Sequence, residues 1–344
     1  MGLRKICSVM VEKMRVTIKD IASDTGLSLA TISKFINNKT VSAENSAIIS
    51  ESIDRLHYIQ NHSAKLLRSS HSKTICMITG SISDVFWAYL FDELSIQFQK
   101  EGYSFLLISI RNKNDKAEAL GLLSREYPDG ILILCDGEEA SEFTPDSFRP
   151  GVPVIFLDNG IPSCPLVTSS GYISTYEGTE YLIRNGHTDI CFLVSTCALE
   201  TLKDRLRGCL DACKDNGITV KPEHLIQSDT HDLDYSMLRG ILNAPTRPTA
   251  VFSLSYVSSI SLLRFFNQNH NLSKQFSLLF FDDSPLFRTI SPAITVISQD
   301  MNAMAQTCVK EMIKRIENPE IKDQVTFYVP TKFEKRKSVS PVNK

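Results

Sequence analysis

The 344-residue chain lacks the features that mark membrane and secreted proteins. No apolar run reaches the roughly 20 residues that a membrane-spanning helix needs. The apolar stretch 6–11 is too short for a signal peptide, and Ile6 stands where N-myristoylation requires Ser or Thr. We therefore expect a cytoplasmic protein with no membrane partner. Residues 1–15 are either an extension or, if translation starts at Met14, largely absent.

Cysteine and histidine occur without the spacing that metal sites need. The nine cysteines are scattered, with no CxxC pair, and most lie in apolar runs, so we interpret them as reduced core residues. Cys209 and Cys213 are four apart, but no second Cys or His pair is near. The seven histidines are dispersed, and no phosphate loop, G-x-S-x-G motif or paired catalytic carboxylates occur. We expect no metal, no cofactor and no enzyme activity.

Length and charge indicate several domains of unequal character. A chain of this length with 42% apolar residues has material for two or three domains. The net charge is only −2, but residues 1–73 hold 11 Lys and Arg against 6 Asp and Glu, so the rest of the chain is acidic. This asymmetry favours a nucleic-acid partner for the basic end, although ordinary surface charge explains it equally well.

The stretch 16–38 combines apolar residues at helical spacing with small polar ones. Thr17 and Asp20 are placed as a capping-box pair, Gly26 marks a tight turn, and Ser28 caps a second helix. The outward face of this second helix is small, polar and cationic, which suits the major groove of DNA. The pattern predicts a helix-turn-helix, but any capped helical hairpin has the same spacing.

Residues 17–38 read T-I-K-D-I-A-x-x-x-G-L-S-x-A-T-I-S-x-x-I-N-N. This run closely resembles, without a gap, the DNA-binding headpiece of the LacI/GalR family of bacterial transcription regulators. The resemblance implies DNA contacts from Thr17, Ser28, Leu29, Ala30, Thr31, Ser33, Lys34 and Asn37. Lys34 stands where family members commonly carry a guanine-reading arginine, and lysine lacks the bidentate fork. Base preference there should differ.

A third helix, opened by Ser42, is expected to complete a headpiece over residues 16–60. The resemblance implies a hinge helix and linker over 61–73. Its Leu67 would enter the minor groove as an apolar wedge, with Asn61, Ala64 and Lys65 beside it. The alternative is a plain linker whose leucines pack on the next domain.

From residue 74 the chain alternates between apolar strands and amphipathic helices. The strand-like runs are TICMIT, YSFLLISI, GILILC, VPVIFLD, DICFLV, TAVFSL and FSLLFFDD, and the helical stretches include 86–100, 115–125, 175–185 and 203–216. This alternation is typical of parallel sheets covered on both faces. Seven strands exceed one compact sheet, so we expect two α/β lobes.

The resemblance implies the same architecture: an all-α helix-turn-helix headpiece and a periplasmic-binding-protein-like core of two doubly wound parallel-sheet lobes. The lobes would be joined by crossings near Pro165–Gly171, Ile294–Gln299 and Lys322–Thr326. We expect the effector-binding and dimerisation domain to cover 74–337, with an N-lobe of about 74–166 and 297–323, a C-lobe of about 167–296 and 324–337, and a tail of 338–344. No apolar heptads suggest a tetramerising helix.

Parallel sheets bind ligands at the carboxyl ends of their strands, so the cleft between the lobes is the expected site. The resemblance implies effector contacts from Trp87, Asp158, Arg205, Ser255, Tyr256 and Asp282. Carboxylates accept from hydroxyl or amino groups and a guanidinium donates in a fixed fork, which suits a small polyol or a purine-like molecule. The alternatives are a core role for Trp87 and an Arg205–Asp282 pair across an empty cleft.

The chain departs from the family pattern at two places in this cleft. Ser255 and Tyr256 replace an Asn-Asp pair, and Phe280 replaces the glycine before the aromatic-Asp pair. The first departure removes polar partners that a sugar would need. The effector is therefore expected to be unusual or absent.

These observations predict a homodimeric, sequence-specific DNA-binding transcription regulator, in particular a repressor. It would bind a pseudo-palindromic operator and respond to a sugar or another metabolite. One alternative is a regulator of the same fold that a protein partner controls or that has no sugar effector. Another is a cytosolic sugar-binding or sugar-modifying α/β protein.

Overall fold

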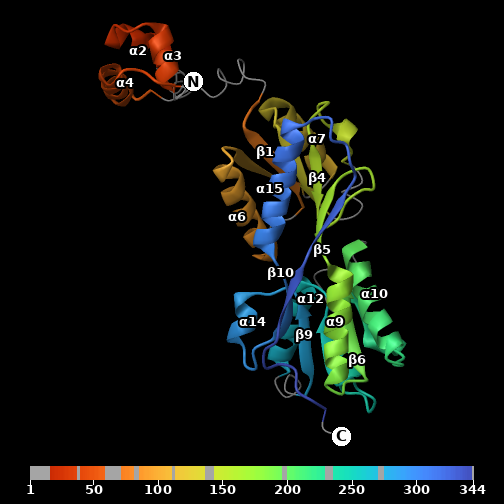
Figure 1. Cartoon of the computed structure of the whole chain (residues 1–344). Helices are drawn as coiled ribbons and strands as arrows, with labels where there is room; N and C mark the ends of the chain where they lie inside the picture. Colours follow the sequence, from red (N-terminus) through yellow and green to blue (C-terminus); the bar gives the residue numbers. More distant parts are fainter. Residues whose placement is uncertain are drawn as a thin grey trace, which may run out of the picture. The chain divides into compact units, whose positions relative to one another are not determined.

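Figure 1 shows the chain as a computed structural model, and the structure describes residues 16–36, 39–58, 71–80, 85–110, 113–135, 143–195, 200–228, 235–269 and 275–342. The chain divides into two compact units, Met1–Ser70 and His71–Lys344. Within the described ranges, no helix combines the length and the apolar character needed to span a bilayer.

The first unit is a three-helix module, as the sequence predicts. It consists of α2 (Ile18–Thr25), α3 (Leu29–Ile36) and α4 (Ala43–Leu56). Each helix contributes one fully buried isoleucine, Ile21, Ile32 and Ile49, and partly buried apolar side chains surround these three. So small a core stabilises little by itself. A polar contact adds to it, because Asp24 at the end of α2 accepts hydrogen bonds from Ser52 and Arg55 of α4, both at 2.5 Å.

Helix α2 has the predicted ends. The Thr17 side chain accepts from the Lys19 amide at 3.3 Å, and the Thr17 amide donates to Asp20 at 2.7 Å. Hydrogen bonds from Thr17 lower the pKa of the Asp20 carboxyl. Gly26 ends the helix with φ 69°, in the left-handed region. The chain then turns directly into α3, whose Thr31 amide donates to the Ser28 hydroxyl at 3.2 Å.

The second unit alternates strands and helices along the chain. Its strands are β1 (Thr74–Thr79), β2 (Ser104–Ser109), β3 (Gly130–Leu134), β4 (Val154–Leu157), β5 (Leu166–Ser169), β6 (Ile190–Ser195), β7 (Leu225–Ser228), β8 (Ala250–Ser253), β9 (Ser277–Phe281), β10 (Thr295–Gln299), β11 (Thr326–Val329) and β12 (Thr331–Glu334). Its helices are α6 (Val85–Lys100), α7 (Lys113–Glu126), α9 (Gly171–Arg184), α10 (Glu200–Asp215), α11 (Tyr235–Leu242), α12 (Tyr256–Gln268), α14 (Pro285–Thr289) and α15 (Met301–Glu317).

The strands form two six-stranded sheets with equivalent orders. The first sheet runs β11-β5-β4-β3-β1-β2 and the second β12-β10-β9-β8-β6-β7. All neighbouring strands pair in parallel except β12, which is antiparallel to β10. The two lobes therefore repeat one topology, in which β4 corresponds to β9 and β5 to β10.

Alternate side chains of each strand face opposite helical layers. In β1, Ile75 and Met77 face the layer that contains α6 and α15, which lie side by side in Figure 1, whereas Cys76 and Ile78 face the layer of α7. In the second lobe, α11, α12 and α14 cover one face of the sheet, and α9 and α10 cover the other. The expected core position of the cysteines is confirmed for those in the described ranges, because all of them are buried.

The lobe crossings differ in part from the expected positions. Strand β5 belongs to the first sheet, so the first crossing follows Ser169, and the third lies at Pro330 between β11 and β12. The expectation of a crossing at Lys322–Thr326, with residues from 324 onward in the C-lobe, was wrong, because β11 pairs with β5 of the first sheet over Thr326–Val329. The second crossing joins β10 to α15, which packs against α6.

The segment after β12 is docked on the second lobe rather than forming a loose tail. The buried Ser338 hydroxyl donates to the Leu278 carbonyl at 2.6 Å and accepts from the Thr295 amide at 2.7 Å. Further along, the Val342 amide donates to the Asn185 carbonyl at 2.9 Å. These contacts position the last described residues across the amino-terminal end of the β9–β10 region.

Candidate nucleic-acid interface and inter-lobe site

Helix α3 exposes most of the side chains that the sequence assigns to DNA. Leu29 is 45% exposed although it is apolar, Ala30 and Lys34 are also exposed, and Ser33 is half-buried. The hydroxyls of Ser28 and Thr31 lie 2.9 Å apart, so they form one local polar pair at the start of the helix. The module thus presents a face of small side chains with one cation, backed by a rigid apolar core.

Five of the expected DNA contacts lie outside the described residues. These are Asn37, Asn61, Ala64, Lys65 and Leu67. Thr17 is exposed at the start of α2, but its hydroxyl and its amide are both engaged with Asp20.

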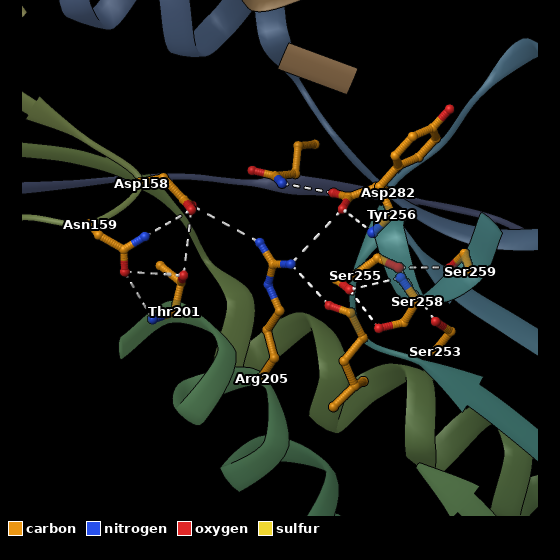
Figure 2. A network of polar contacts seen from close by, with 12 residues as sticks. Asp158, Asn159, Thr201, Arg205, Ser253, Ser255, Tyr256, Ser258, Ser259 and Asp282 are labelled. Atoms are coloured by element: carbon orange, nitrogen blue, oxygen red, sulfur yellow. Dashed lines mark hydrogen bonds and ion pairs between the residues drawn. The ribbon is translucent and has the colours of Figure 1, made fainter. Parts of the chain in front are cut away.

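In the second unit, two aspartates occupy equivalent positions at the ends of strands. Asp158 follows β4 with φ 60°, and Asp282 follows β9 with φ 76°, so both have left-handed backbones that side chains normally avoid. Strained backbone of this kind tends to gather at ligand sites. Both side chains are buried, and both face the same guanidinium, that of Arg205 (Figure 2).

Arg205 of α10 joins the two lobes electrostatically. Its Nη2 lies 4.0 Å from Asp158 Oδ1 of the first lobe, and its Nη1 lies 3.9 Å from Asp282 Oδ2 of the second. It donates to the Leu254 carbonyl at 3.0 Å, and its guanidinium carbon lies 3.8 Å from the centre of the Phe281 ring. Both distances are longer than a hydrogen bond, so the guanidinium forms only weak ion pairs with the two carboxylates.

The position of Arg205 follows from close contact between α9 and α10. Thr175 of α9 donates a hydrogen bond to the Arg205 carbonyl at 2.7 Å. One turn later, a Cβ at Gly208 would lie 2.3 Å from the Tyr172 carbonyl oxygen. Only glycine allows the two backbones to approach this closely. The three-residue spacing between Arg205 and Gly208 thus reflects a packing requirement that fixes the arginine.

Further polar side chains connect the lobes around this arginine. The Thr201 hydroxyl at the start of α10 donates to Asp158 at 3.4 Å and to Asn159 Oδ1 at 3.3 Å (Figure 2). Asp282 also accepts from the Tyr256 amide at 3.1 Å and from Gln299 Nε2 at 2.7 Å. Its neighbour Asp283 is not part of this cluster, because it pairs with Arg336 and Arg288.

Four buried polar atoms near the crossings have no hydrogen-bond partner among the described residues. They are Thr168 Oγ1, Ser169 Oγ, Arg205 Nε and Gln299 Oε1. Thr168 and Ser169 end β5, and Gln299 ends β10, so these atoms come from equivalent strand ends of both lobes. Buried polar groups are normally paired, and leaving one unpaired costs about 1–3 kcal/mol. Such a group of atoms can be satisfied by a polar ligand.

The other residues predicted for the cleft also contact neighbouring protein groups, and their role toward an effector stays a prediction. Trp87 is half-buried at the start of α6 and packs against the first-lobe core. Ser255 caps α12 by accepting from the Ser258 amide at 3.3 Å, and the Tyr256 ring lies 5.8 Å from that of Phe287. Phe280 is fully buried in the second-lobe core, on the face away from Arg205, so this departure from the family pattern fills core space.

Sequence reasoning missed five members of this polar group: Asn159, Thr168, Ser169, Thr201 and Gln299. A usable signal was present, because the runs LVTS and TVISQ are apolar strands that end in polar residues. Both runs lie within the segments expected as lobe crossings, and no local pattern in the sequence marks Thr201.

The comparisons with known proteins agree with this architecture. The family described as "Periplasmic binding protein-like domain" matches residues 179–339. The HTH-type transcriptional repressor PurR of Yersinia pestis bv. Antiqua is 28% identical over 337 residues, covering 94% of this chain and 97% of the relative. The protein of the same name from Photorhabdus laumondii is 28% identical over 331 residues, covering 94% and 96%.

Solved structures share the fold over nearly the whole chain. The Lac repressor dimer bound to operator and the anti-inducer ONPF has a TM-score of 0.80 at 21% identity, covering 94% of this chain and 99% of that one. The transcriptional regulator CelR in complex with cellobiose has a TM-score of 0.69 at 20% identity, covering 94% and 100%. The chain therefore shares the fold of these solved structures, and over 94% of its length it is similar in sequence to transcriptional repressors named PurR.

Proposed function

We propose that this protein is a sequence-specific DNA-binding repressor, which binds a pseudo-palindromic operator as a homodimer and is modulated by a small molecule bound between its lobes. The observation that carries the proposal is the exposed face of α3, held by a capped helix-turn-helix with a buried isoleucine core. A helix with small outward side chains can approach base edges closely. Two such helices related by two-fold symmetry would read the two halves of a palindrome.

The roles of the individual residues follow from their chemistry. Exposed Leu29 suits the methyl group of thymine, and Ser28, Thr31 and Ser33 offer hydroxyls that donate or accept. Lys34 supplies a compact charge rather than a fork, so it suits a phosphate or a single guanine acceptor. Leu67 remains the proposed minor-groove wedge, with Asn61, Ala64 and Lys65 beside it.

The first test is selection of bound sites from random duplex DNA with the full chain, followed by affinity measurements on the selected duplex. We expect a palindromic consensus and an affinity that falls steeply with salt. Lys34→Ala should weaken binding about tenfold, since a charged or base contact is worth about 1–3 kcal/mol. Lys100→Ala, which removes the same charge from an exposed position at the end of α6, is the matched control and should bind like wild type. Equal affinities for both variants would refute the proposed interface.

The effector proposal depends on the polar group around Arg205. Asp158, Arg205 and Asp282 provide acceptors and a donor fork, and the unpartnered atoms of Thr168, Ser169 and Gln299 lie at equivalent strand ends of the two lobes. Such a mixed set suits a polyhydroxylated or heterocyclic metabolite. Because Asp158 belongs to one lobe and Arg205 to the other, a ligand that binds both would favour one lobe arrangement. It would change DNA affinity only by its differential affinity for the two arrangements.

A thermal-shift screen of sugars, nucleosides and phosphosugars tests this site. We expect at least one compound to raise the melting temperature of wild type and not that of Arg205→Ala. The replacement of the usual Asn-Asp pair by Ser255 and Tyr256 favours a second candidate function, in which a protein partner controls a regulator of this fold. A screen without hits, combined with retained operator binding, would support that candidate.

A further inference from the structure

A buried carboxylate holds the start of the second unit. Asp129, just before β3, has a side chain that is 1% exposed. Its Oδ1 accepts from the Ser72 amide at 2.9 Å and from the Ser72 hydroxyl at 3.3 Å, and its Oδ2 accepts from the Lys73 amide at 2.9 Å. The Nδ1 atom of His71 lies 3.6 Å from Oδ2. One acidic group thus contacts each of the first three residues of the unit.

The backbone at this point has an unusual conformation. Lys73 has φ 53°, in the left-handed region, where a residue with a side chain costs roughly 1–2 kcal/mol. Successive amides next to a left-handed residue form a concave site for an anion. Here the anion is the protein's own Asp129, which offsets the strain. Two further contacts hold Lys73. Its carbonyl accepts a hydrogen bond from the Ser104 amide at 2.8 Å, and its ammonium donates to the Tyr103 hydroxyl at 3.2 Å.

We infer that Asp129 is a positioning residue for DNA binding, because its carboxylate fixes the direction in which the chain enters the first lobe at residues 71–73. This inference depends on the proposed function, since these residues directly follow the expected hinge. Without the carboxylate, Lys73 relaxes to a negative φ and the entry point gains freedom. DNA binding then has to order residues that the wild type holds in place beforehand. Ordering one residue corresponds to about tenfold in affinity.

The sign of the effect separates this mechanism from simple electrostatics. Asp129→Asn removes a negative charge, so through-space repulsion alone predicts tighter binding to a polyanion. The anchor predicts weaker binding, because asparagine keeps one acceptor oxygen for one backbone N–H, and its NH2 group, which only donates, would face the other backbone N–H. A decrease in affinity therefore cannot come from the charge change.

The experiment compares four proteins on the duplex selected with wild type. Asp129→Asn and Lys73→Pro should both bind about tenfold or more weakly. The proline removes the Lys73 donor and forces φ near −65°, so it opens the anchor while Asp129 remains. Ser72→Ala keeps both backbone donors to Asp129 and should bind within about twofold of wild type. It loses the 3.3 Å hydroxyl contact with Asp129 and the 3.2 Å contact in which that hydroxyl accepts from the Thr74 amide, but neither backbone hydrogen bond of the anchor.

Hydrogen exchange gives a readout without DNA. In wild type the amides of Ser72 and Lys73 should be protected. In Asp129→Asn they should exchange at least about tenfold faster, while the Met77 and Ile78 amides in β1 keep their protection. If Asp129→Asn also loses protection in β1, the substitution has disturbed the sheet, and the DNA affinity of Lys73→Pro decides the question instead. Wild-type affinity in Asp129→Asn or Lys73→Pro would overturn the inference, whereas failure of wild type to bind any duplex would refute the proposed function instead.

Discussion

At the scale of single residues, Gly26 determines the geometry of the helix-turn-helix. Its φ of 69° lies in the left-handed region, and a Cβ built there would meet no atom within 4 Å. Any cost of substitution is therefore due to the backbone and not to steric contact. We predict that Gly26→Ala destabilises the first unit by about 1–2 kcal/mol. Hydrogen exchange of the Ile21 and Ile32 amides in the full chain would measure this loss.

Gly26→Asn is the matched control for this turn. Asparagine adopts left-handed backbone more readily than alanine, so it should recover part of the lost stability. Equal protection in wild type and Gly26→Ala would contradict the prediction. The result bears on DNA affinity as well, because the turn sets the angle between α2 and the exposed face of α3.

Residue-level prediction from sequence succeeded where the signal is local. The Thr17 and Asp20 cap, the Gly26 turn and the Ser28 cap each depend on neighbours within four positions, and the structure confirms them. Asp158, Arg205 and Asp282 were found only through family resemblance, and their convergence is a property of the fold. Thr201 and Asn159 could not be found, because their contact spans 42 positions and two lobes.

At the scale of elements, the α9–α10 pair positions the candidate site. A Cβ at Gly208 would lie 2.3 Å from the Tyr172 carbonyl oxygen and 2.5 Å from Thr175 Oγ1. The Tyr172 carbonyl belongs to the backbone of α9 and cannot shift without moving the helix, so Gly208→Ala has to push α9 and α10 apart. We predict a loss of about 1–3 kcal/mol in unfolding free energy. Because Arg205 lies one turn away, affinity for any compound found in the screen should also fall.

Gly121→Ala in α7 provides the control for this prediction. A Cβ at Gly121 would meet nothing within 4 Å, so the substitution should stabilise the protein by roughly 0.5–1 kcal/mol through helix propensity. Denaturant unfolding of both variants would measure the contrast. A Gly208→Ala protein as stable as Gly121→Ala would show that the helices have room to separate.

At the scale of the whole molecule, the sequence predicted two α/β lobes because seven near-continuous apolar runs are more strands than one compact sheet holds. It did not predict which edge strand belongs to which sheet. Strands β11 and β12 are both four residues long and are separated only by Pro330, so their length and their place in the sequence do not show which sheet each one joins. Their assignment depends on partners about 160 and 40 positions away, β5 and β10, and such pairing is not visible in local sequence.

The docked C-terminal segment gives the molecule a pH-dependent stability. His187 is buried between the Thr249 hydroxyl at 2.9 Å and the Ser340 carbonyl at 3.1 Å. Burial lowers the pKa of His187 below its ordinary value of 6.5, although the hydrogen bond to Ser340 opposes the shift. On acidification the unfolded chain therefore takes up this proton first. The contribution of neutral His187 to stability is fully present well above pH 6.5 and is lost progressively as the pH falls through 6.5 toward the lower pKa of the folded state.

We predict that the unfolding free energy of wild type, measured in urea, declines between about pH 7.5 and about pH 5.5, and that His187→Gln declines less. Glutamine can still donate to the Ser340 carbonyl but does not titrate. Some decline should remain in the variant, because burial and Lys221 lower the pKa of His224 in the same direction. Identical pH profiles would show that His187 does not couple the C-terminal segment to proton uptake. A weaker dependence in the variant would locate the acid sensitivity at the contact between the second lobe and the end of the chain.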